Sequence, residues 1–196
     1  VRMGVKGYFI QYKFIIPEDL KHSSYTYQKL FRALYGYTQA VFKSNGKVYH
    51  YPREGVLSDI PYIRPGKNCV IIPPGTFQKL IDFFKTGRNP THHWKWKGDW
   101  KAVYYMNEKD VGEKKAVEAL ISLLGRTHLT KSAETPLNLI EAAKQLVARG
   151  TSSPEQKSLF ISKAKPIVDS DWFKSTNSLS AELKEFYSNY RTLKGV

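Results

Sequence analysis

The chain has 196 residues and a formal net charge of +14, and 41% of its residues are hydrophobic. This apolar content is enough for a buried core, and no run of about 18 apolar residues exists that would predict a membrane-spanning helix. A single cysteine, Cys69, excludes an internal disulfide framework and a cysteine-based zinc site. The first twenty residues lack the pattern of a signal peptide, so we expect an intracellular protein, cytoplasmic or nuclear.

The first predicted element is a strand at residues 7–16, which Pro17 ends. Its alternating positions form one apolar, aromatic face and one half-polar face. The apolar face carries Tyr8, Ile10, Tyr12, Phe14 and Ile16.

A helix follows, with Ser23 or Ser24 as its N-cap and Gly36 as its C-terminal end. Lys29 and Arg32 fall off its apolar stripe, so we expect both to be solvated. The core-facing stripe consists of Tyr27, Leu30, Phe31, Leu34 and Tyr35.

The clearest local pattern is a β-hairpin at residues 37–51. Asn45-Gly46 separates two β-rich runs and predicts a type I′ turn, because both central positions of that turn need positive φ. Basic and aromatic side chains gather on the hairpin and just beyond it: Lys43, Lys47, Tyr49, Tyr51 and Arg53. These side chains could reach a strand or groove of nucleic acid, and an ordinary solvated hairpin tip is the alternative.

The next segment is predicted to be a loop at residues 53–68, followed by a short apolar strand, Cys69–Ile72. Cys69 is interpreted as a small buried hydrophobe rather than a nucleophile. Thr76 opens a helix that Gly87 ends.

Three tryptophans and three lysines crowd the segment that follows. Alternation places Trp94 and Trp96 on one strand face and Lys95 and Lys97 on the other, and a second strand begins at Lys101. So many tryptophans cannot easily all be buried in a small domain. We expect a stacking platform with phosphate-binding lysines, and a strand pair whose tryptophans cap the core is the alternative.

From Asn107 on, the pattern is helical, with Asp110 and Glu113 resembling a capping box. Two more helices are predicted to open at Thr135-Pro136 and Ser153-Pro154. A last helix carries apolar residues at helical spacing: Leu179, Leu183, Phe186, Tyr190 and Leu193.

The predicted fold class is therefore α+β, with an antiparallel-rich sheet and helices in the N-terminal part and an all-helical C-terminal part. Residues 1–106 are interpreted as a basic, aromatic-rich domain, and residues 107–196 as a helical domain or C-terminal extension. The C-terminal helices could complete the core or bind a protein partner or a second copy of the chain.

The excess charge and the aromatic rings share one segment. Residues 1–106 hold 17 Lys and Arg against 6 Asp and Glu, together with 21 aromatic residues. A positive field attracts polyanions, and rings beside it stack on unpaired bases. We therefore predict a non-enzymatic nucleic-acid-binding protein that favours single-stranded DNA or RNA. The predicted contacts are Lys43, Lys47, Tyr49, Tyr51, Arg53, Trp94, Lys95, Trp96, Lys97 and Lys101.

Two other functional classes stay open. Asp99-Trp100-Lys101 matches the short D-x-K element of metal-dependent nucleases. Asp59 or Asp82 could supply the second carboxylate that such a site needs. A match of only three residues is expected by chance. The sequence lacks HExxH, CxxC and Gly-rich phosphate loops, so we predict no catalytic residue, metal ligand or cofactor. The other class is an assembly subunit with an acidic protein partner. A membrane surface is not expected, because no helix pairs a Lys-rich face with an exposed apolar face.

Overall fold

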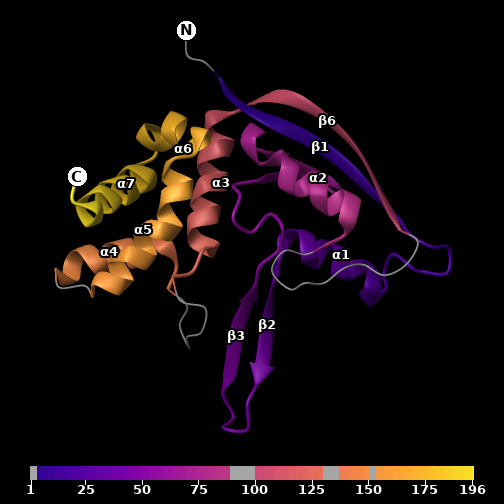
Figure 1. Ribbon diagram of the computed structural model, residues 1–196, viewed down its shortest axis with the longest axis horizontal. Helices are drawn as coiled ribbons and strands as arrows, with labels where there is room; N and C mark the ends of the chain where they lie inside the picture. Colours follow the sequence, from indigo (N-terminus) through magenta and orange to yellow (C-terminus); the bar gives the residue numbers. More distant parts are fainter. Residues whose placement is uncertain (1–3, 89–99, 130–136, 151–152) are drawn as a thin grey trace.

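The computed structural model describes residues 4–88, 100–129, 137–150 and 153–196 (Figure 1). The fold is α+β, as the sequence predicts, with an antiparallel sheet and helices up to residue 111 and a helical region after it. Within the described ranges, no helix has the length and hydropathy needed to cross a membrane.

The main sheet has four strands in the spatial order β4-β5-β1-β6, and all neighbours are antiparallel. Its longest strands, β1 (Val5–Ile15) and β6 (Lys101–Val111), pair along their whole length. On the other side of β1 lies β5 (Cys69–Ile72), which also pairs with β4 (Ile63–Gly66). The predicted first strand and the predicted Cys69–Ile72 strand are thus neighbours.

Two helices connect these strands: α1 (Tyr25–Tyr35) follows β1, and α2 (Phe77–Thr86) follows β5. The element order β1–α1–β4–β5–α2–β6 is that of the split β-α-β, or ferredoxin-like, motif. A separate two-stranded hairpin, β2 (Tyr37–Phe42) and β3 (Val48–Arg53), is inserted after α1. It projects away from the rest of the molecule (Figure 1).

Both α1 and α2 pack on one face of the main sheet. On β1, the alternating side chains of Ile10, Tyr12 and Phe14 are buried beneath them, as the period-two pattern predicts. Ser24 caps α1, because its hydroxyl oxygen accepts a hydrogen bond from the Tyr27 N–H at 3.2 Å. The predicted core-facing stripe of this helix is confirmed.

In the described residues after 112, the C-terminal region has five α-helices: α3 (Glu113–Arg126), α4 (Leu139–Arg149), α5 (Pro154–Val168), α6 (Asp171–Thr176) and α7 (Ala181–Lys194). They enclose a second hydrophobic core, which also takes in one end of the opposite face of the sheet. The sheet contributes three buried side chains to this core: Val5, Ile71 and Val111.

The prediction of helix from Asn107 onward is wrong. β6 continues to Val111, and α3 follows Gly112 without a side-chain cap. The charged run that resembles a helix start instead pairs with β1, where Lys6 lies opposite Asp110 and their ion pair spans 2.9 Å. The division into two domains at Met106 stays a prediction.

Three other local predictions are corrected. The loop at residues 53–68 contains β4, whose Pro65 is tolerated because β4 ends the sheet order. Thr76 precedes α2 but makes no side-chain cap, since its hydroxyl donates to the Pro73 carbonyl oxygen. α4 starts later than Thr135-Pro136 predicts, because Asn138 accepts a hydrogen bond from the Glu141 N–H at 2.9 Å and caps it.

The hairpin is confirmed, but the type I′ turn is wrong. Only Gly46 of the turn has a positive φ, at 76°. The Lys43 N–H donates to the Lys47 carbonyl and the Gly46 N–H to the Lys43 carbonyl, both at 3.0 Å. This pattern closes a three-residue loop that needs one left-handed position, which glycine supplies. Asn45 instead uses its side-chain oxygen to accept from the Lys47 N–H at 3.0 Å.

Candidate nucleic-acid interface

The hairpin has two chemically different faces, because residues opposite each other in an antiparallel pair project to the same side. One face carries three opposed pairs: Tyr37 with Arg53, Gln39 with Tyr51, and Val41 with Tyr49. The other face carries Thr38 with Pro52, Ala40 with His50, and Phe42 with Val48. Tyrosine and cationic side chains therefore gather on a single side of the hairpin.

Cations lie over the tyrosine rings of that side. The Lys43 Nζ is 4.6 Å from the centre of the Tyr49 ring, and the Arg53 guanidinium carbon is 5.9 Å from that of Tyr51. Arg53 is further oriented by donating from its Nε to the Gln39 side-chain oxygen at 3.0 Å. The structure thus brings four of the predicted contact residues together, and a fifth, Lys47, lies exposed at the hairpin tip.

Helix α1 extends this surface with Tyr25 and with Lys29 and Arg32, which the sequence predicts to be solvated. The Arg32 guanidinium carbon lies 5.1 Å from the Tyr37 ring centre and 5.3 Å from that of Tyr25. The Lys29 Nζ is 4.8 Å from the Tyr25 ring centre. Both rings are exposed. A signal for them did exist, because Tyr25, Lys29 and Arg32 share the helix face opposite the core-facing stripe.

We call this continuous set the cation–tyrosine surface: Tyr25, Lys29, Arg32, Tyr37, Lys43, Tyr49, Tyr51 and Arg53. Its charge is of one sign, because residues 25–53 contain five Lys and Arg and no Asp or Glu. Tyr25 and Tyr37 are exposed, and Tyr49 and Tyr51 are half-buried. Cation–aromatic pairs at exposed sites contribute about 0.5–1 kcal/mol each. Because each pair is this weak, a ligand can replace a cation over a ring at a small cost in free energy.

The root of the hairpin is held by a close approach of two backbone segments. Gly36 ends α1 with a φ of 76°, and a Cβ on it would lie 2.6 Å from the Arg53 carbonyl oxygen. A Cβ on Gly55 would lie 2.4 Å from the Gly36 nitrogen. Glycine is required at both positions, because any side chain would push the hairpin away from the end of α1.

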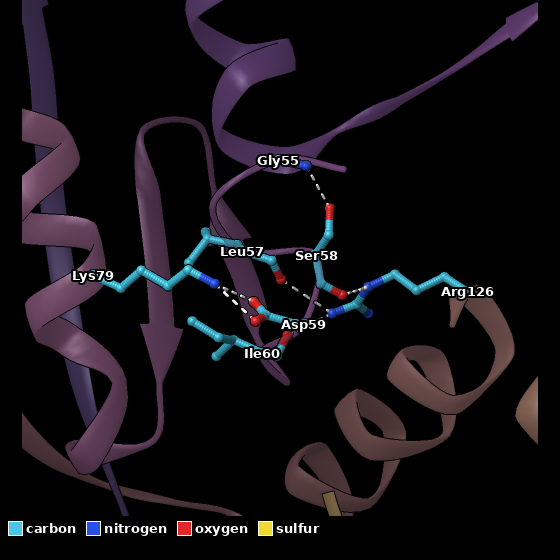
Figure 2. A network of polar contacts seen from close by, with 7 residues as sticks. All are labelled: Gly55, Leu57, Ser58, Asp59, Ile60, Lys79 and Arg126. Atoms are coloured by element: carbon cyan, nitrogen blue, oxygen red, sulfur yellow. Dashed lines mark hydrogen bonds and ion pairs between the residues drawn. The ribbon is translucent and has the colours of Figure 1, made fainter. Parts of the chain in front are cut away.

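The turn that follows the hairpin is clamped by Arg126 from the end of α3 (Figure 2). Its guanidinium donates to the carbonyl oxygens of Ser58 at 3.3 Å and Ile60 at 2.5 Å. On the other side of the turn, the Asp59 carboxylate pairs with Lys79 of α2 at 2.7 Å. Burial lowers the pKa of Arg126, although an arginine stays charged at neutral pH. The projecting hairpin is thus attached to a turn held from two directions.

A pocket of about 350 Å³ lies between the hairpin root, this turn and the end of α3. Its lining combines Arg53 and Arg126 with Glu54 and Asp59. Because both signs of charge meet there, and because the guanidinium of Arg126 already donates to backbone carbonyls, the pocket does not extend the cationic surface.

The remaining predicted contacts lie elsewhere. Lys101 begins β6 opposite Ile15 and is exposed on the main sheet, apart from the hairpin. The other four predicted contacts, Trp94, Lys95, Trp96 and Lys97, fall outside the described residues.

The residues of the nuclease alternative are only partly described, since Asp99 also falls outside the described ranges. Asp59 is paired with Lys79, and the Asp82 carboxylate accepts from the Gln78 amide at 2.8 Å. In the described part of the chain, no three His, Cys, Asp or Glu side chains gather as metal ligands would.

Comparisons with protein-family models, with curated proteins and with solved structures found no match. What the chain binds is therefore inferred from its own residues.

Proposed function

We propose that the protein binds single-stranded nucleic acid through the cation–tyrosine surface. One observation carries this proposal: tyrosine rings with cations over them line one face of a projecting hairpin. The chain from residue 25 to residue 53, which forms this surface, contains no Asp or Glu. Rings offer stacking to bases, and the cations offer charge to phosphates, so both parts of a nucleotide are recognised.

The two groups of side chains have separate tasks in this proposal. Tyr49 and Tyr51 stack on unpaired bases, at about 1–3 kcal/mol per base. Lys43, Lys47 and Arg53 contact phosphates and release counterions, so the affinity falls as salt rises. A single strand is favoured over a duplex because its bases have free faces, whereas paired bases are already stacked on their neighbours.

The test uses fluorescence anisotropy with labelled single-stranded DNA, single-stranded RNA and duplex DNA of about 16 nucleotides. We expect the single strands to bind more tightly than the duplex at about 50 mM salt. The double variant Tyr49→Ala/Tyr51→Ala should bind at least about 30-fold more weakly, because two stacking contacts are lost.

The matched control is Phe42→Ala. Phe42 is another ring of the same hairpin, 80% exposed, but it lies on the opposite face. We expect this variant to bind like the wild type. The proposal is wrong if neither single strand binds at low salt, or if Phe42→Ala weakens binding as much as the double tyrosine variant does.

A further inference from the structure

The face of the main sheet opposite α1 and α2 is divided into two halves. Where β1 begins and β6 ends, the C-terminal helices bury this face. Where β1 ends and β6 begins, side chains of the same face are exposed, with Tyr105 at 64%, Val103 at 48% and Ile15 at 47%. The structure, in the part that it describes, thus leaves half of this sheet face open to solvent.

Register defines the exposed half. Three cross-strand pairs project from it, and we call them the open sheet patch: Gln11 with Tyr105, Lys13 with Val103, and Ile15 with Lys101. Ile15 and Val103 are neighbours of Lys13 and Lys101, so apolar and cationic side chains alternate across the patch. Single exposed apolar residues are normal on protein surfaces, but Ile15, Val103 and Tyr105 share one region of one sheet face with two cations.

Charge on this face is again of one sign. Lys109 lies further along the same face of β6, with its Nζ 4.3 Å from the centre of the Phe9 ring. The two carboxylates of β6, Glu108 and Asp110, point to the other face, where both lie near Lys6. The positions of β1 and β6 that share a face with the patch carry three lysines and no acidic residue.

We infer that the open sheet patch is a second contact site for single-stranded nucleic acid. Tyr105 stacks on one base, and Lys13 and Lys101 contact phosphates further along the strand, on the side of Tyr105 where β1 ends and β6 begins. An exposed ring on a sheet surface can stack on a base, and the lysines make the patch complementary to a polyanion. This inference rests on the proposed function, because it assigns a second surface to the same class of ligand.

The experiment measures binding of oligo-dT and oligo-U to the full chain carrying Tyr105→Ala. We expect about tenfold weaker binding, the loss of one stacked base. Tyr104→Ala is the matched control, because the Tyr104 ring is its chain neighbour but faces α2, where it stacks on Phe84 at 5.4 Å between centres. That variant should retain the wild-type affinity once the folded fraction is taken into account.

A second variant tests the cationic half of the patch. Lys13→Gln/Lys101→Gln should reduce the dependence of log K on log salt by about 1.4, because two phosphate contacts to a single strand are lost. Ultraviolet cross-linking to oligo-dT followed by peptide mapping should label the segment of β6 that contains Tyr105 as well as β3.

The outcomes separate the two proposals. If Tyr49→Ala/Tyr51→Ala loses affinity while Tyr105→Ala and the lysine variant bind like the wild type, the patch is not a nucleic-acid site and the hairpin proposal stands. If Tyr105→Ala changes only the sedimentation coefficient of the free protein, the patch joins two copies of the chain and the inference is overturned. If the wild type binds neither oligonucleotide, both proposals fail.

Discussion

Aromatic rings serve different purposes in the two regions of the molecule. Five of the six rings after residue 106 are at most 3% exposed, and the sixth, Tyr187, packs partly buried against the same core. In residues 5–111, rings also fill a core, but others lie exposed or half-buried beneath lysines and arginines on the hairpin and α1. A buried ring contributes to stability, and an exposed ring under a cation is available to a ligand. Substitutions in the two regions should therefore separate stability from binding.

The largest expected effect lies in the helical region, at Trp172. This ring is 1% exposed, and its indole N–H donates to the Lys6 carbonyl oxygen at 2.7 Å, which ties α6 to β1. Trp172→Ala should lower the free energy of unfolding by about 3–5 kcal/mol, because a large cavity is created. Urea unfolding followed by circular dichroism measures the loss, and the folded fraction should still bind oligo-dT. A loss below about 1 kcal/mol would show that α6 does not anchor the sheet.

The next effect concerns the clamp between the two regions. Arg126→Met leaves the carbonyl oxygens of Ser58 and Ile60 without their donor, which should cost about 1–3 kcal/mol. We expect faster hydrogen exchange in the turn at residues 55–60, measured by mass spectrometry. Arg126→Lys keeps the charge but lacks the planar fork, so its exchange should also be faster than in the wild type. Wild-type exchange in both variants would argue against the clamp.

Charge on the hairpin should affect the salt dependence of binding, whereas charge on the C-terminal helices should not. Lys43→Gln/Lys47→Gln/Arg53→Gln should lower the salt dependence of single-strand binding by about 2, because three phosphate contacts are lost. The control, Lys144→Gln/Lys157→Gln/Lys184→Gln, removes the same charge from exposed positions of α4, α5 and α7. Equal slopes in the two triple variants would mean that net charge, and not the hairpin, attracts the ligand.

The smallest expected effect is a pH dependence of stability at His128. Burial, and then the charge of Lys163, lower the pKa of His128 below its ordinary value of 6.5. The unfolded chain therefore binds this proton more readily, so the stability contribution is complete above about pH 6.5 and falls as the pH drops below it. Urea unfolding at about pH 7 and pH 5 should show a larger loss for the wild type than for His128→Gln. An equal loss in both would place the titration elsewhere.

Much of the fold follows from local patterns in the sequence. Three elements were predicted from neighbouring residues alone, and the structure confirms them. They are β1, from its alternation, α1, from its apolar stripe and Ser24 cap, and the hairpin, from Asn45-Gly46. The same reasoning was wrong at residues 107–111, because pairing with β1 favours a strand where the charge pattern favours a helix start. Strand pairing joins residues far apart in the chain, so it lies outside any local window.

The candidate site divides in the same way. The hairpin residues were predictable, since a two-residue period shows which side chains share a face. The α1 residues of the site were not predictable in this way: Tyr25, Lys29 and Arg32. They lie beside the hairpin because the backbone approaches closely at Gly36 and Gly55, which brings the end of α1 against the hairpin root. The sequence by itself determines how many aromatic rings and charges the chain has. Which rings are buried and which stay under a cation in solvent was decided only by the tertiary structure, because burial depends on the helices and strands that pack over each face.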